Sequence, residues 1–269
     1  MAYEILALDL DGTLLNSQHM ISLKTKEALL DIMKAGKKVV LASGRPTTGM
    51  LHIVEELRLR EYESYIISYN GARITNLKTG EHIYNKTVPR EFMKDAYDIA
   101  EKFGLDFVTY DEDYVYCNQE PNAYTLYEVK EERMKLRVCD DFAEDINFPV
   151  NKCMFVGDPK LVEEAEKALL NRYHSLYSIY RSVDFFVEIM AQNTDKATAL
   201  NRLVSSIGLT RDQLICCGDG YNDLAMMEYA GLGVAMGNAI DEVKERADFV
   251  TKSNDEDGIV HVIEKFMRR

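Results

Sequence analysis

Short apolar runs alternate with segments in which apolar residues return every three or four positions. The runs occupy residues 5–8, 39–42 and 65–68, and an apolar stripe at residues 29–33 lies between the first two. Short runs are typical of buried strands, and the wider spacing is typical of helices. The repeated strand–helix–strand order predicts an α/β fold with a doubly wound parallel sheet and helices on both faces.

The pattern changes between residues 85 and 187, where we expect antiparallel strand pairs with helices on one side. After Glu188 the parallel pattern resumes, with an apolar strand at residues 214–217. We therefore expect one core domain, residues 1–84 and 188–269, split by an inserted α+β cap domain, residues 85–187.

Composition and net charge argue against two classes of protein, those that bind nucleic acids and those that bind membranes. The chain has 269 residues and a formal net charge of −13. Nucleic acids and anionic membranes are bound through basic surface, so neither is an expected partner. No signal peptide is recognised, and no stretch approaches the roughly 20 apolar residues of a membrane helix. The five cysteines lack CxxC spacing, which together with these features predicts a cytoplasmic protein with free thiols.

Polar residues follow three predicted parallel strands. Asp9 and Asp11 follow the first strand, Ser43 follows the second, and Asp219 follows residues 214–217. Ligands in open α/β sheets bind at the carboxyl ends of the strands. These residues are therefore expected to meet at one site.

Asp9 and Asp11 offer two carboxylates to that site. Residues i and i+2 of an extended strand point the same way, so both can face one pocket. A divalent cation or a shared proton would relieve their repulsion. One carboxylate can attack phosphorus, while the other protonates the leaving oxygen and later activates water. The alternative is that both residues form a turn and a helix cap.

Ser43, Gly44 and Lys196 suit a phosphoryl group. A hydroxyl beside backbone N–H groups makes a phosphate cradle, although the same residues fit an ordinary turn. Lys196 falls in the first turn of a helix that Thr194 is expected to cap, where a cation opposes the helix dipole. This position favours pairing with a phosphoryl oxygen; the alternative is a surface lysine.

Asp219, Asn222 and Asp223 crowd a glycine-flanked loop after a buried strand. Carboxylate and amide oxygens are the hard ligands that Mg2+ prefers. A metal site is one interpretation, and a helix cap is the other.

The order of these elements resembles the haloacid-dehalogenase (HAD) superfamily. Residues 9–14 (DLDGTL) are similar to its first motif, DxDGT[LV], and residues 218–223 (GDGYND) to its fourth, GDxxND. Ser43 and Lys196 look like its second and third motifs. The insert between them resembles the C2-capped Cof-type branch, which includes bacterial sugar phosphatases. The Asn70-Gly71 pair looks like the cap entry of that branch.

The resemblance implies a Rossmann-like core and a magnesium-dependent phosphatase of small phosphorylated metabolites, such as sugar phosphates. By motif, Asp9 would be the nucleophile and a Mg2+ ligand. Asp11 would be the general acid/base and bind Mg2+ through its backbone carbonyl, and Asp219 would be a further ligand. The phosphoryl group would be held by four residues: Ser43, Gly44, Lys196 and Asn222.

Two further points follow from the resemblance. Asp223 would orient Lys196 or the metal waters. Ala197 follows Lys196, where such proteins commonly have glycine, so the backbone approach of the lysine departs from the pattern.

A phosphosugar mutase is the main alternative, because capped relatives with the same motifs return the phosphoryl group to the substrate. Release of free phosphate, measured beside formation of an isomeric sugar phosphate, separates the two. A non-catalytic phospho-metabolite-binding protein is a third interpretation, which hydrolysis of an aryl phosphate would test. The sequence leaves the individual substrate open, and either a monomer or a small homo-oligomer is expected.

Overall fold

The computed structural model describes residues 2–268, with the side chain of Ala143 left undescribed. The chain folds into two compact units, each treated separately below. The first unit has three segments: Met1–Gly44, Leu51–Tyr84 and Asp195–Arg269. The second unit has two: Arg45–Met50 and Asn85–Thr194.

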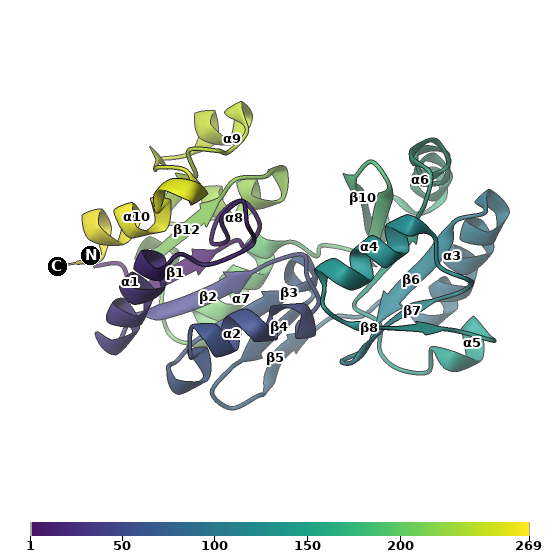
Figure 1. Cartoon of the computed structure of the whole chain (residues 1–269), viewed down its shortest axis with the longest axis horizontal. Coiled ribbons are helices and arrows are strands. Elements are labelled where there is room, and N and C mark those ends of the chain that lie inside the picture. Colours follow the sequence, from purple (N-terminus) through teal and green to yellow (C-terminus); the bar gives the residue numbers. More distant parts are fainter. Residues whose placement is uncertain (1, 269) are drawn as a thin grey trace. The chain divides into compact units, whose positions relative to one another are not determined.

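An eight-stranded sheet forms the centre of the first unit (Figure 1). Its strands, in spatial order, are β14 (Phe249–Val250), β13 (Leu232–Ala235), β12 (Leu214–Gly218), β1 (Ile5–Leu8), β2 (Lys38–Ala42), β3 (Tyr65–Ser68), β4 (Arg73–Asn76) and β5 (His82–Asn85). The strands from β14 to β3 are parallel, and β4 runs antiparallel to β3. This mixed α/β architecture with a parallel core confirms the predicted fold class.

Helices cover both faces of this sheet. Its helices are α1 (Leu23–Lys34), α2 (Leu51–Glu56), α7 (Lys196–Ser206), α8 (Leu224–Tyr229), α9 (Asp241–Arg246) and α10 (Gly258–Phe266). Ile5 and Ala7 of β1 pack in one apolar cluster with residues of α7, α8 and α9. Because side chains alternate along a strand, Leu6 and Leu8 face the other side, where α1 and α10 contact each other.

Short 3-10 turns complete the elements: η1 (Thr48–Met50), η2 (Leu59–Glu61), η3 (Tyr69–Gly71), η4 (Arg211–Gln213), η5 (Tyr221–Asp223) and η6 (Asn254–Glu256). Ser22 caps α1 through its hydroxyl. Asp195, not Thr194, caps α7, because its carboxylate accepts from the backbone N–H of Thr198 at 2.7 Å. The Thr194 hydroxyl instead donates to the carbonyl of Ala191, so the expected cap was wrong by one residue.

The second unit contains a six-stranded, mainly antiparallel sheet. In spatial order its strands are β10 (Tyr177–Val183), β11 (Phe186–Ala191), β9 (Lys152–Val156), β6 (Asp106–Tyr110), β7 (Tyr114–Cys117) and β8 (Lys135–Val138). Its helices are α3 (Arg90–Phe103), α4 (Ala123–Glu131), α5 (Phe142–Asp145) and α6 (Pro159–Tyr173). Residues of α3 and α6 share one apolar cluster with Phe107 and Phe155 of the sheet.

Helix α4 departs from the expectation of helices on one side only. Tyr110 lies on β6 three residues after Phe107, so it faces away from the cluster of α3 and α6. Its hydroxyl donates to Glu128 of α4 at 2.5 Å. The buried residues of α4 are polar, whereas Leu126 and Tyr127 are exposed. An apolar pattern could not reveal how this helix packs.

The limits of the units differ from the expected domain limits in two places. The expected boundary at residue 188 falls inside β11, which pairs with β9 from Phe186 to Met190. The second unit also includes Arg45–Met50, where the guanidinium of Arg45 donates to the carbonyl of Glu131 at 2.8 Å. Hydrogen bonding between distant segments, which no local pattern encodes, sets both limits.

Within residues 2–268, no helix has the length and apolar character needed to span a bilayer.

Candidate active site

Strand register brings three of the predicted residues to one edge of the parallel sheet. Leu8 pairs with Leu41 on one side and with Cys217 on the other. Asp9 therefore lies level with Ala42 at the end of β2 and with Gly218 at the end of β12. Ser43 and Asp219 are the next residues along those two strands. Neighbouring strands are about 4.8 Å apart, so the three residues share one small region.

Lys196 joins two carboxylates at this edge. Its Nζ donates to Oδ1 of Asp9 at 2.6 Å and to Oδ1 of Asp223 at 2.7 Å. The Lys196 side chain is 0% exposed, so both ion pairs are shielded from water. These contacts offset the unfavourable position of a cation at the N-terminus of α7.

Asp223 uses both carboxylate oxygens within the protein. Oδ1 accepts from Lys196, and Oδ2 accepts from the backbone N–H groups of Asp219 and Gly220, each at 3.0 Å. These bonds fix the loop after β12 and orient Lys196. Asp223 is thus suited to positioning its neighbours.

Asp219 is held by the turn after Asp9. The Thr13 hydroxyl donates to Oδ1 of Asp219 at 2.8 Å. Gly12 has a φ of +80°, and a Cβ atom there would lie 2.3 Å from Oδ2 of Asp219. Only glycine fits this close approach. Thr13 was not among the predicted site residues; its hydroxyl directly after Asp-Gly was the available signal.

Asp9, Asp219 and Asp223 form the only group of three potential metal-ligating side chains within residues 2–268. One ligand atom from each lies within 4.8 Å of the others. These acidic residues could hold a metal ion. Asp9 and Asp219 each have one oxygen, Oδ2, that receives no hydrogen bond from the described residues.

The electrostatics show an excess of negative charge. Burial, followed by repulsion from Asp223, raises the pKa of Asp9 well above its usual value, against the opposing effect of Lys196. Burial raises the pKa of Asp219 to about 6. Burial disfavours the charged form of Lys196, but Asp223 and Asp9 outweigh this and raise its pKa. One lysine does not neutralise three carboxylates.

Asp11 is not a member of this group of three carboxylates. Its side chain is 46% exposed, and its Oδ1 is 3.7 Å from Nδ1 of His19. Strand β1 ends at Leu8, so the rule that residues i and i+2 point the same way does not extend to Asp9 and Asp11. The Asp11 carboxylate is therefore available to solvent at the edge of the site.

The remaining predicted residues take different positions. Ser43 is buried, and its backbone carbonyl accepts from the N–H of Asn70 at 2.9 Å. A Cβ atom on Gly44 would lie 3.0 Å from Nδ2 of Asn70.

Asn222 and Ala197 lie away from these residues in sequence. Asn222 is exposed on η5, and its side chain makes no hydrogen bond to Lys196. Ala197 packs against the apolar cluster of the first unit, where its methyl group is accommodated.

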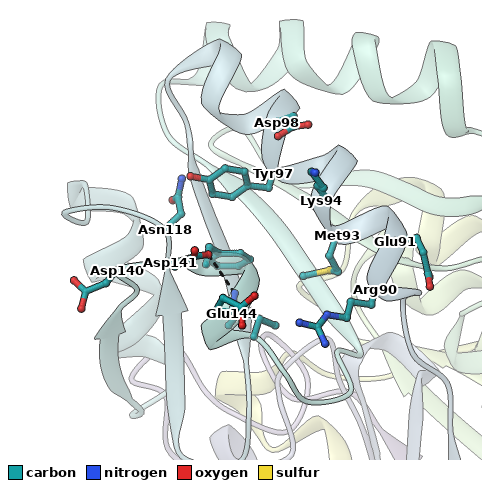
Figure 2. A pocket seen from close by; sticks show the side chains of 12 residues that line it. Arg90, Glu91, Met93, Lys94, Tyr97, Asp98, Asn118, Asp140, Asp141 and Glu144 are labelled. Carbon is teal, nitrogen blue, oxygen red and sulfur yellow. Dashed lines mark hydrogen bonds between the residues drawn. The ribbon is translucent and has the colours of Figure 1, made fainter.

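A separate cavity of about 770 Å3 lies within the second unit, between α3 and the segment around α5 (Figure 2). Arg90, Lys94 and Tyr97 line it from α3, opposite Asp141 and Glu144. None of the predicted site residues contributes to it.

The family pattern of the haloacid dehalogenase-like hydrolases matches residues 6–263. The chain is 34% identical over 268 residues to YxeH, a candidate phosphatase of Bacillus subtilis, covering 98% of each chain. It is 30% identical over 260 residues to YcsE of Bacillus subtilis, a 5-amino-6-(5-phospho-D-ribitylamino)uracil phosphatase, covering 97% of this chain and 94% of the relative.

Solved structures agree with these sequence matches. A haloacid dehalogenase-like hydrolase from Bacteroides thetaiotaomicron matches with a TM-score of 0.95 and 41% identity, covering 98% of this chain and 99% of that one. The HAD subclass IIB sugar phosphatase BT4131 matches with a TM-score of 0.82 and 28% identity, covering 98% of both chains.

Proposed function

The chain belongs to the haloacid dehalogenase-like hydrolases and is a phosphatase; from this premise we propose that it hydrolyses small sugar phosphates with Asp9 as nucleophile and Mg2+ as cofactor. The observation that supports this most is the pair of bonds from Lys196 to Asp9 and Asp223, with Asp219 alongside. A nucleophile, a fixed cation and a free carboxylate oxygen then share one buried site.

In the first step, an oxygen of Asp9 attacks phosphorus and the bond to the leaving oxygen breaks. Lys196 holds the Asp9 carboxylate in place for this attack through its bond to Oδ1. Asp11 gives its proton to the leaving oxygen, and an exposed side chain can move to reach it. The product alcohol departs and an aspartyl-phosphate remains on Asp9.

In the second step, Asp11 takes a proton from water as the water oxygen attacks phosphorus. The bond between phosphorus and Asp9 breaks, and inorganic phosphate leaves. The same residue thus acts first as acid and then as base, and the carboxylate of Asp9 is restored.

The donor set of the site fits Mg2+. Oxygen ligands suit this ion, and Asp9 and Asp219 each retain one oxygen for it, whereas Asp223 has both oxygens engaged. The backbone carbonyl of Asp11 is the third ligand in this proposal. When bound, the ion would offset the charge of the carboxylates and of the phosphoryl oxygens.

Ser43, Gly44, Lys196 and Asn222 bind the phosphoryl oxygens in this proposal. Ser43 and Lys196 are supported by their places beside Asp9. Asn222 lies on the exposed loop two residues after Gly220, where its amide can meet a ligand from the solvent side.

The relatives support a hydroxylated leaving group. BT4131 is named as a sugar phosphatase, and YcsE is named for a phosphorylated ribityl compound. Both names describe phosphate esters of hydroxylated carbon chains. We extend this chemistry to the present chain, with its second unit as a C2-type cap, a cytoplasmic location, and a monomer or small homo-oligomer as its state.

The test replaces the nucleophile. Asp9→Asn removes the attacking charge while keeping the side-chain volume, so hydrolysis of sugar phosphates should vanish while the circular dichroism spectrum is retained. Phosphate release should equal the substrate consumed by the parent protein, with no isomeric sugar phosphate formed. Parental turnover in the Asp9→Asn protein would overturn the assignment.

A further inference from the structure

Two asparagines close to the C-terminal end fasten the turn that follows the nucleophile. Nδ2 of Asn238 donates to the backbone carbonyl of Gly12 at 2.7 Å. Oδ1 of Asn238 accepts from the backbone N–H of Asn254 at 2.9 Å. Nδ2 of Asn254 donates to the carbonyl of Leu15 at 2.9 Å. Asn238 and Asn254 together form a bridge, called the asparagine bridge below, across residues 12–15.

The chemistry of the partners fixes both amide groups in one orientation. The carbonyls of Gly12 and Leu15 can only accept, so each must face an NH2 group. The backbone N–H of Asn254 can only donate, so it must face the oxygen of Asn238. A side chain lacking either group breaks the bridge.

The bridged turn carries the contacts that orient Asp219. Thr13 donates to Oδ1 of Asp219, and a Cβ atom on Gly12 would lie 2.3 Å from Oδ2 of the same residue. The segment of Asn238 also reaches the same residue, because the N–H of Ile240 donates to the carbonyl of Asp219 at 3.3 Å. The asparagine bridge therefore connects two groups that contact Asp219, one at its side chain and one at its backbone.

We propose that Asn238 and Asn254 are positioning residues that hold the Gly12–Thr13 turn against Asp219 and so set the affinity of the site for a divalent cation. The identity of that cation rests on the proposed function. Groups that orient a metal ligand without touching the metal commonly change metal affinity about 10- to 100-fold when removed. Displacing Gly12 or Thr13 shifts the oxygen that Asp219 presents.

The experiment titrates the substrate-free, full-length protein with MgCl2 in a calorimeter. Asn238→Ala removes the bonds to Gly12 and Asn254, and Asn254→Ala removes the bond to Leu15. Each should weaken Mg2+ binding about tenfold. The double variant should lose little more Mg2+ affinity than Asn238→Ala alone, because both residues act through one bridge.

Asn76→Ala provides the matched control. Asn76 also accepts from backbone N–H groups in a turn of the first unit, those of Lys78 and Thr79, but at the far end of β4. Its loss should leave Mg2+ affinity unchanged. In the two bridge variants the Mg2+ concentration for half-maximal hydrolysis should rise with the calorimetric constant. Their kcat at saturating Mg2+ should stay within about twofold of the parent value, since Asp9 and Lys196 are untouched.

Parental Mg2+ affinity in both folded bridge variants would overturn the inference, as would an equal loss in Asn76→Ala. If Asn238→Ala does not fold, Asn254→Ala decides the question alone, because it removes a single, partly buried hydrogen bond. A parent protein that binds Mg2+ but hydrolyses no phosphate ester would end the proposed function, while weaker Mg2+ binding in the variants would still support the bridge.

Discussion

Nζ of Lys196 donates to Oδ1 of Asp9 at 2.6 Å, although 187 positions separate the two residues in sequence. This bond joins Asp9, which directly follows β1, to the first residue of α7. It makes the carboxylate of Asp9 part of a buried charge network. The stability of the unit and the chemistry of the site therefore depend on the same residues.

Lys196→Met should abolish hydrolysis and destabilise the fold. The change leaves Asp9 and Asp223 buried without their cation, and breaking a buried ion pair in this way costs about 3–5 kcal/mol. Urea unfolding of the metal-free protein measures the loss. Lys167→Met is the control, since its pair with Glu163 lies on the surface, where solvent screening leaves an ion pair little effect on stability. Equal effects of the two changes would contradict the buried network.

Gly12→Ala should weaken Mg2+ binding and lower stability. The new Cβ would lie 2.3 Å from Oδ2 of Asp219 at a φ of +80°. Gly80→Ala is a matched control, because Gly80 has a φ of +75° but no atom within 4 Å of its Cβ position. Backbone strain of about 1 kcal/mol should appear in both variants, and loss of Mg2+ affinity only in the first. Calorimetry and thermal unfolding separate the two effects.

Added MgCl2 should raise the melting temperature more at pH 8 than at pH 5. Burial raises the pKa of Asp219 to about 6 in the metal-free protein, above its ordinary value of 3.8. A raised carboxyl pKa gives stability that is present below the unfolded value and is lost as pH rises through the folded value. At pH 8 the ionised carboxylate is the destabilising form, which the cation should relieve; at pH 5 protons compete with the metal. Equal shifts at both pH values would contradict this.

Asp11→Asn should lower kcat by about 10²- to 10⁴-fold, because an amide cannot carry out the proton transfers assigned to Asp11. Because the Asp11 side chain is half-exposed, its loss of charge should change the stability of the fold little, and the melting temperature should stay close to that of the parent. Steady-state kinetics and thermal unfolding of the same preparation give both values. A parental kcat would show that another residue transfers the protons.

The sequence alone predicted the parallel core and the meeting of polar residues at one edge of it, because both follow from local patterns. A buried strand ending in polar residues is visible at Asp9, Ser43 and Asp219, and parallel strands bring their carboxyl ends together. The poor fit of Lys196 at a helix start also pointed to a partner elsewhere, which the structure identifies as Asp9 and Asp223.

Other features were set by contacts that no local pattern carries. Glu128 of α4 is buried because the hydroxyl of Tyr110, on a strand 18 positions earlier in the sequence, donates a hydrogen bond to its carboxylate. The second unit extends through β11 because that strand pairs with β9. The end of β1 at Leu8 left Asp11 half-exposed, where an extended strand would have placed it beside Asp9.

The sequence by itself determined which helices and strands form and which polar side chains follow the strands. Both depend on hydrophobic periodicity and on the residues next to each strand. Only the tertiary structure decided how those groups are oriented: Asp223 with both oxygens engaged, Asp219 held by Thr13, and Gly12 fastened by Asn238. Orientation depends on hydrogen bonds between segments distant in sequence, and their geometry exists only after the chain has packed.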